Sequence, residues 1–129
     1  MAELPGIPNP AGNLLLHLEG NLREYIGRQL GHVSYGRNRP QEFKANNISI
    51  QELLRGVTEL KALIPSIIES LSQEAMESEY PEIVLGKALS THAFLISRYG
   101  HLNWHLGQLD YLRRILAGEG AGAIVPVQL

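Results

Sequence analysis

The amino-acid sequence predicts an all-α protein that folds as one helical bundle. Three long stretches repeat apolar residues at helical spacing, and only the C-terminal tail leaves room for a short strand. The chain has 129 residues, a length that suits a single domain over residues 1–129 with one hydrophobic core. Hydrophobic residues make up 44% of the chain, which excludes an intrinsically disordered protein.

The first predicted helix begins at Asn9 and Pro10 and ends near Gly31, after a lead-in over residues 1–9 that is rich in proline and glycine. Its apolar residues fill one arc of about 120° on a helical wheel. They are Leu14, Leu15, Leu18, Leu22, Tyr25 and Ile26. His17 falls about 60° outside this arc, with Asn21 between, so we expect His17 at the edge of the buried face.

A polar connection over residues 31–48 follows, and its charged residues Arg37, Arg39 and Glu42 are expected in solvent, although so long a loop can lie over a pocket. Ser49 and Glu52 have the spacing of a capping box and predict the start of a second helix. Pro65 lies within the apolar pattern of that helix and is expected to kink or break it.

Residues 72–88 are predicted to form a loop, because Tyr80-Pro81 and Gly86 interrupt any helical pattern. Ser90 can cap the last helix, which is predicted to run to about Ala117 before a tail over residues 118–129. The apolar residues of this helix share an arc of about 140°. The arc includes Phe94, Leu95, Leu102, Leu106, Leu109, Leu112 and Leu116, together with His101 and His105, whereas His92 falls outside it.

His101 and His105 are spaced four residues apart, which places both imidazoles on one helix face. With His17 from a neighbouring helix, they predict a site for one divalent transition metal such as Zn, Ni or Fe. Three protein ligands leave a position open, where the metal would lower the pKa of a bound water towards ~7 or ionise a bound thiol. The alternative is that these residues are buried histidines of a helical bundle without a metal.

Three further residues are candidates for the surroundings of this site. Gln108 and Asn21 lie close enough on their helix faces to hydrogen-bond the ligating histidines. Arg98 lies one turn before His101, where its side chain could hold a substrate anion or extend to the surface. No glutamate follows His101 directly, so the pair is not the zinc-protease motif with its built-in general base.

Composition excludes several other classes of function. The chain has no cysteine, which excludes disulfides, thiolate ligands and a cysteine nucleophile. A net charge of −2 and the lack of a basic stripe argue against nucleic acid as a partner. We find neither an apolar run long enough to span a bilayer nor a signal peptide, so a cytoplasmic protein with no membrane partner is the expectation.

Three segments resemble the DinB-like (DinB/YfiT-like) superfamily of helical-bundle metalloenzymes, over about residues 11–117. They are Gly12–Arg23, Arg37–Phe43 and His101–Tyr111, the last of which contains the motif His-x-x-x-His-x-Gly-Gln. The resemblance implies an up-down-down-up four-helix bundle whose metal is held by His17, His101 and His105. It also implies frequent homodimers. The helix that precedes the first histidine in the family is missing here, so the bundle is expected to be shortened at its N-terminal helix.

The resemblance further implies an activity, because characterised relatives use mycothiol, bacillithiol or glutathione as transferases and isomerases. The leading expectation is therefore a metal-dependent enzyme that transfers a low-molecular-weight thiol to an electrophilic small-molecule substrate. One alternative is a non-catalytic metal-binding or dimerisation module, which the missing helix favours because it would leave an apolar face uncovered. A second alternative is a metal-dependent hydrolase.

Overall fold

The described residues of the chain form helices and their connections, as the all-α prediction requires. The computed structural model describes residues 11–44, 48–84 and 86–117. Its elements are α1 (Ala11–Leu22), the π-helix η1 (Arg23–Arg28), α2 (Arg39–Lys44), α3 (Ile50–Ser70), α4 (Gln73–Glu77) and α5 (Thr91–Ala117). Strand-like pairing in these ranges is limited to the isolated bridges Glu79↔Ser90 and Val84↔Lys87.

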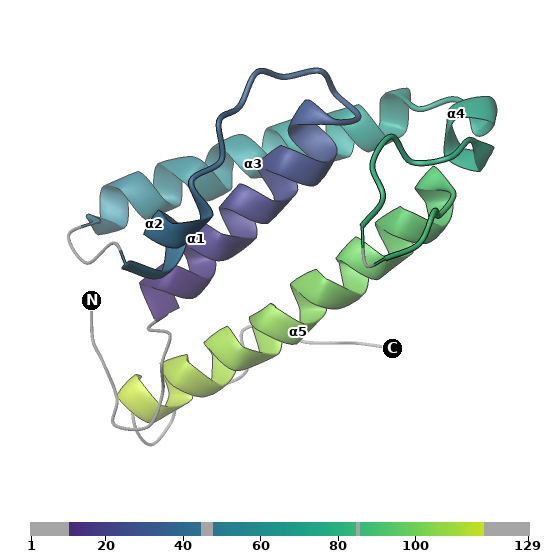
Figure 1. Cartoon of the computed structure of the whole chain (residues 1–129). Coiled ribbons are helices and arrows are strands. Elements are labelled where there is room, and N and C mark those ends of the chain that lie inside the picture. The colour runs from purple at the N-terminus through teal and green to yellow at the C-terminus, as the bar shows by residue number, and fades with distance from the viewer. Residues whose placement is uncertain (1–10, 45–47, 85, 118–129) are drawn as a thin grey trace.

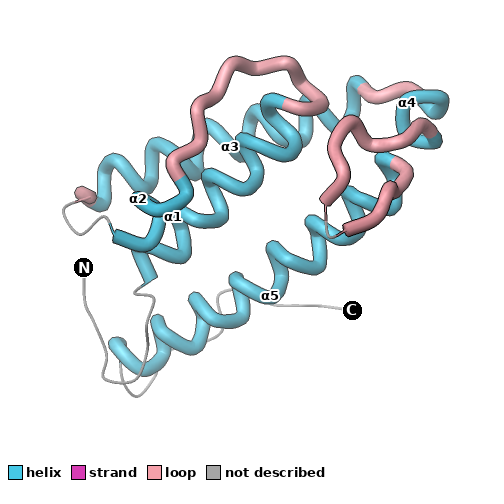
Figure 2. The backbone as a smooth tube through the Cα atoms, in the orientation of Figure 1, coloured by secondary structure: helices cyan, strands magenta, loops and turns pink. Residues whose placement is uncertain are grey.

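Helix α1 is the central element and contacts α2, α3 and α5. Figure 1 shows that α1 and α3 run in the same direction, joined by a crossover that returns over α1 through α2, and that α5 runs in the opposite direction. Figure 2 shows loops around α4 and the start of α5 at one end of the long helices, whereas the connection after η1 runs back over α1 to α2. The long helices among the described residues are α1 with η1, α3 and α5, and the predicted lead-in, helix start at Asn9 and tail lie outside these residues.

The hydrophobic core lies between α1 and α5. Buried leucines of the two helices pack together there, namely Leu14, Leu18, Leu109 and Leu112. A second cluster fixes the other end of α5, where the Tyr80 and Phe94 rings stack with centroids 3.7 Å apart. The hydroxyl of Tyr80 donates to the backbone oxygen of Tyr25 at 2.6 Å. The two clusters therefore hold α5 along the length of α1 and η1.

The structure corrects three details of the sequence-based prediction. Pro65 does not break α3, which continues from Ile50 to Ser70, and because Pro65 is exposed, the carbonyl it leaves unpaired can bond water. The expected loop over residues 72–88 contains α4, whose N-terminus is capped by Ser72 through a 3.0 Å bond from the Ala75 amide. The polar connection over residues 31–48 contains α2. The predicted capping box of Ser49 and Glu52 is confirmed.

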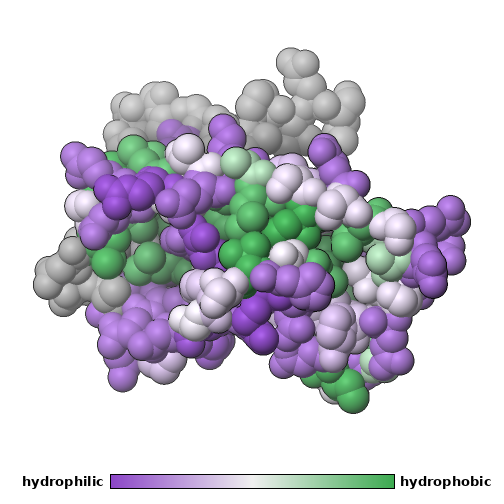
Figure 3. Space-filling model, turned by 90° about the horizontal axis from the view of Figure 1, so that it is seen from above, coloured by the Kyte–Doolittle hydropathy of each residue, from purple (hydrophilic) through white to green (hydrophobic). Residues whose placement is uncertain are grey.

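Apolar side chains also reach the surface. Figure 3 shows hydrophobic residues gathered in the middle of the face seen from above, with hydrophilic residues along its borders. Leu54 of α3 is exposed, and so is Leu116 of α5, which belongs to the apolar arc expected for the last helix. Within the described residues, no helix combines the length and the apolar character that a bilayer crossing requires.

Candidate metal centre

Three histidines from two helices converge at the edge of the α1–α5 core. His17 of α1 is buried, and His101 and His105 of α5 are half-buried beside it. One ring nitrogen from each residue lies within 4.8 Å of the other two. His17 Nε2 and His101 Nε2 are 3.3 Å apart, close to the edge of about 3.3 Å that two Zn–N bonds of 2.0–2.1 Å subtend in a tetrahedral site. The donor set and its spacing therefore fit a divalent transition metal.

The carboxylate of Glu42 orients His17 for ligation. His17 Nδ1 lies 3.1 Å from Glu42 Oε1, and since an ionised carboxylate only accepts, the proton belongs on Nδ1. The lone pair of Nε2 is then directed towards the other two histidines. A carboxylate behind a histidine in this way is the usual partner of a metal-ligating imidazole.

Glu42 is held in place by Arg37 of the connection and by Asn13 of α1. Arg37 donates to both of its carboxylate oxygens, through Nε at 2.8 Å and Nη2 at 2.9 Å. The amide of Asn13 in α1 donates to the Glu42 backbone oxygen at 2.9 Å. Gly20 of α1 permits this approach, because a Cβ at that position would overlap the Glu42 carboxylate.

The expectation that Arg37 and Glu42 are solvated is therefore wrong, since Glu42 is only 6% exposed and Arg37 is half-buried. Arg39 is exposed as expected and lies over the Phe43 ring. The sequence does contain a signal for α2 that the prediction missed. Asn38 and Pro40 are residue types typical of a helix N-terminus, and they lie at the start of this helix. A short helix there places Glu42 on one defined face rather than in a solvated loop.

Of the other residues expected around the site, Gln108 hydrogen-bonds a histidine as predicted, whereas Asn21 and Arg98 line the cavity. Gln108 Oε1 lies 2.6 Å from His105 Nδ1, so it accepts a hydrogen bond from Nδ1–H and leaves the lone pair of Nε2 to ligate. Asn21 is buried and lines the cavity beside the histidines, but the side chain that hydrogen-bonds His17 Nδ1 is Glu42. Arg98 is also buried and lines the same cavity. His92 is exposed, as the wheel predicted.

The electrostatics favour neutral imidazoles, the form that binds metals. Burial lowers the pKa of His101 to about 4, helped by the nearby His105 and Arg98. Burial also lowers the pKa of His17, and the hydrogen bond that His17 donates to Glu42 opposes this effect. Neither ring therefore needs to lose a proton near neutral pH before it can ligate.

The histidines face a cavity of about 440 Å³. It is lined by side chains of α1, η1, α5, α2 and the segments around it: His17, Asn21, Tyr25, Arg37, Arg39, Phe43, Val84, Arg98, His101 and His105. Within the described ranges, the three histidines form the one group of potential ligands close enough to share a metal. Three protein ligands beside a cavity are the arrangement found in catalytic zinc sites, whereas structural zinc sites have four protein ligands.

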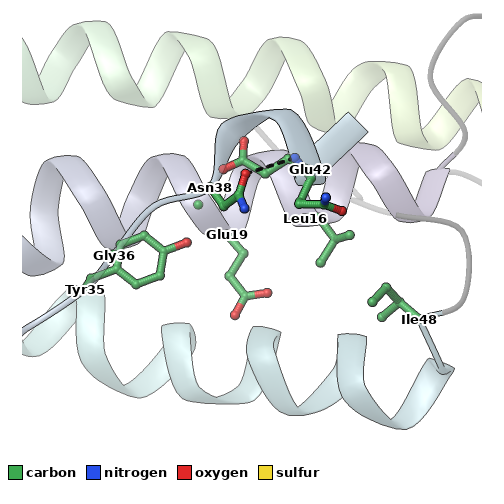
Figure 4. A pocket seen from close by; sticks show the side chains of 9 residues that line it. Leu16, Glu19, Tyr35, Gly36, Asn38, Glu42 and Ile48 are labelled. Atoms are coloured by element: carbon green, nitrogen blue, oxygen red, sulfur yellow. Dashed lines mark hydrogen bonds between the residues drawn. The ribbon is translucent and has the colours of Figure 1, made fainter. Parts of the chain in front are cut away.

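A second cavity of about 360 Å³ lies on the other side of Glu42. Figure 4 shows Glu19 of α1, Tyr35 of the connection and Glu42 of α2 around it. The Glu19 carboxylate accepts from Arg23 Nε at 2.9 Å and is thus already paired. This cavity contains none of the three histidines.

Comparison of the chain with protein-family models, curated proteins and solved structures gives no match. The resemblance to the DinB-like superfamily accordingly stays an expectation from three sequence segments.

Proposed function

We propose that this protein is a divalent-metal-dependent enzyme of the DinB-like type, which transfers a low-molecular-weight thiol to an electrophilic small molecule. The observation that carries the proposal is the set of three histidines on the wall of a cavity, with two of their Nδ1 atoms bonded to Glu42 and Gln108. The choice of a thiol follows from the resemblance. A bound divalent metal would supply Lewis acidity, which lowers the pKa of a thiol in its open position.

The residues of the chain have separate tasks in this proposal. His17, His101 and His105 would hold the metal, while Glu42 keeps Nδ1 of His17 protonated and Gln108 keeps Nδ1 of His105 protonated. The thiol proton leaves to solvent, because no carboxylate is among the described residues that line the cavity. The sulfur lone pair forms the new bond to carbon, and the leaving group of the electrophile departs with the electron pair of the bond that breaks.

The proposal is tested with untagged protein reconstituted with Zn²⁺, Ni²⁺ or Fe²⁺, a panel of thiols that includes glutathione, and the chromogenic electrophile chlorodinitrobenzene. We expect thiol consumption and chloride release that require both the metal and His105. The His105→Ala variant should lose the activity, and His92→Ala, an exposed histidine of the same helix, should keep it. Equal rates in wild type and His105→Ala would contradict the proposal, and ester hydrolysis without thiol would favour a hydrolase instead.

A second candidate function, a dimerisation module, is favoured by an exposed apolar stripe on α5. The stripe lies within an arc of about 100° on the outer side of the helix. Its apolar residues and glycines are Ile96, Gly100, Trp104, Gly107, Tyr111 and Ile115, and exposed Arg114 lies at one border of the arc, at the same wheel angle as Ile96. Trp104 is 70% exposed and Tyr111 is 72% exposed. At 150–250 Å² per aromatic side chain, these two residues offer roughly 200–350 Å² of the ~800 Å² that each partner buries in a standard interface.

The order of large and small residues in this stripe is complementary to itself, so we propose a second copy of the chain as its partner. In an antiparallel pair of α5 helices related by a twofold axis, Trp104 can face Gly107 of the partner subunit. Tyr111 then faces Gly100 of the partner subunit, and the two isoleucines at the ends of the stripe meet each other. A Cβ built on either glycine has no neighbour within 4 Å, so the backbone at both positions is open to the side chain of a partner. Such matching of one surface patch to itself is what a twofold interface requires.

Sedimentation equilibrium over a range of concentrations tests this pairing. Wild type should dimerise, and Trp104→Glu should be monomeric, because it places a charge in the centre of the stripe. Leu116→Glu is the matched control, since Leu116 is an exposed apolar residue of α5 outside the stripe. A monomeric wild type, or a dimer that survives Trp104→Glu, would contradict the pairing. A dimer that binds neither metal nor thiol would identify a non-catalytic module.

A further inference from the structure

Arg98 is a buried cation without an acidic partner among the described residues. Arg98 is only 8% exposed, and its Nε has no hydrogen-bond partner. Its Nη2 donates to Ser97 Oγ, a neutral group, at 3.3 Å. Arg37 of the same cavity differs, because both oxygens of Glu42 accept from it. Burying a charge without a counter-ion costs free energy, so a buried arginine of this kind needs an anion from elsewhere.

Two aromatic rings hold the Arg98 guanidinium in place. Its Cζ lies 5.4 Å from the centroid of the Tyr25 ring and 5.3 Å from that of the Phe94 ring. These cation–π contacts fix the group without neutralising its charge. A cation–π contact uses the charge of the guanidinium and none of its N–H donors, and guanidinium N–H groups are the donors that bind a carboxylate or phosphate.

The position of Arg98 connects it to the candidate metal centre. It precedes His101 by three residues on α5, a rise of about 4.5 Å along the helix axis, and both residues line the 440 Å³ cavity. The cavity wall also contains Arg37 and Arg39, whereas no aspartate or glutamate is among its described lining residues. A ligand in this cavity would therefore meet Arg98 about one helical turn from His101, together with Arg39 and with Arg37, whose charge is already paired with Glu42.

We propose that Arg98 binds the anionic group, a carboxylate or a phosphate, of the small molecule that this cavity accepts. The inference rests on the proposed function for one point only, namely that the other end of the same molecule carries the thiol that faces the histidines. The preferred thiol is accordingly one with an anionic group a few carbon atoms from its sulfur. Exposed Arg39 gives the ligand a second cation at the cavity mouth.

The first experiment uses metal-free protein, so that it does not depend on the proposed function. Succinate and inorganic phosphate are titrated by calorimetry into wild type, Arg98→Met and Arg28→Met. Arg28 is the matched control, because it is paired with Glu24 on the exposed side of η1. We expect at least one of the two anions to bind, about tenfold or more weakly in Arg98→Met and unchanged in Arg28→Met. The titrations also show which of the two anions is preferred. No binding of either anion to wild type, or equal binding by Arg98→Met, would overturn the inference.

The second experiment uses Co²⁺-loaded protein, in which a bound thiolate gives a charge-transfer absorption band. Mercaptopropionate should bind wild type about tenfold or more tightly than neutral mercaptoethanol, and Arg98→Met should lose this preference. If mercaptoethanol binds equally well in wild type, the anion inference fails while a metal-bound thiol stands. If Co²⁺ does not bind but succinate or phosphate still does, the proposed function fails while the anion site stands.

Stability separates a binding role from a structural one. Replacing a buried charge that lacks a partner with an apolar side chain of similar length is commonly neutral or stabilising. Arg98→Met should therefore unfold in urea at the same or a higher concentration than wild type in the absence of ligand. A clear loss of stability in both Arg98→Met and Arg98→Lys would assign Arg98 a structural role and overturn the inference.

Discussion

Replacing Glu42 with glutamine is the sharpest test of how the candidate metal centre is built. The substitution keeps the size of the side chain and removes the negative charge that His17 Nδ1 and Arg37 share. Loss of the carboxylate behind a ligating histidine typically weakens metal binding by about 10–100-fold, or roughly 1.4–2.7 kcal/mol. We expect this weakening for Zn²⁺ in Glu42→Gln.

The same substitution also leaves Arg37 without its counter-charge. The Arg37 and Glu42 side chains are 12% and 7% exposed, so their pair is largely buried. Breaking a buried pair costs about 3–5 kcal/mol of unfolding free energy, and we expect about 3 because the glutamine oxygen can still accept one hydrogen bond. Urea unfolding of the metal-free protein measures this term separately from metal affinity.

The assay is competition for Zn²⁺ between the protein and a chromophoric chelator at a temperature where both variants are folded. Glu59→Gln is the control, because Glu59 is paired with Arg23 at 2.6 Å on the exposed side of α3. The control should bind Zn²⁺ like wild type. A Glu42→Gln protein that binds Zn²⁺ within about twofold of wild type would refute the role of Glu42, since the 10–100-fold range then does not apply.

Three further outcomes are expected. Gly20→Ala should weaken Zn²⁺ binding and lower stability, because its Cβ displaces the Glu42 carboxylate, whereas Gly36→Ala, whose Cβ meets open space, should do neither in the same two assays. The hydrogen bonds from Ser49 lower the pKa of Glu52. The stabilisation that they give is therefore present above the ordinary pKa of 4.5 and is lost as the pH falls below it. Glu52→Gln should thus destabilise the protein more at pH 7 than at pH 3, as measured by urea unfolding. Chelation of the metal should leave the circular dichroism of the helices intact, because the leucine core between α1 and α5 does not depend on the histidines, and unfolding on chelation would indicate a structural site.

The long helices and the placement of the three histidines were predictable from the sequence because both follow from local periodicity. Apolar spacing located the long helices, and the wheel separated His101 and His105 from exposed His92. The Ser49 capping box gave the start of α3 to the residue. A candidate metal ligand on the buried face of a helix can therefore be predicted from the sequence.

The role of Glu42 was not predictable, because it depends on tertiary contacts. Glu42 is 25 residues from His17 along the chain, and its burial depends on Arg37 and on the missing side chain of Gly20. A charged residue in a polar connection is ordinarily solvated, so the polar composition of residues 31–48 predicted an exposed Glu42. Likewise, Pro65 could remain inside α3 only because its surroundings are exposed to water.

Metal analysis of the untagged protein is the most direct test of the candidate centre. After reconstitution with Zn²⁺ and removal of the excess, elemental analysis should find one metal ion per chain in wild type and in His92→Ala. His17→Ala, His101→Ala and His105→Ala should each retain far less than one. Wild-type protein that is folded but holds no stoichiometric metal, or single variants that hold as much as wild type, would contradict a metal centre at these three histidines.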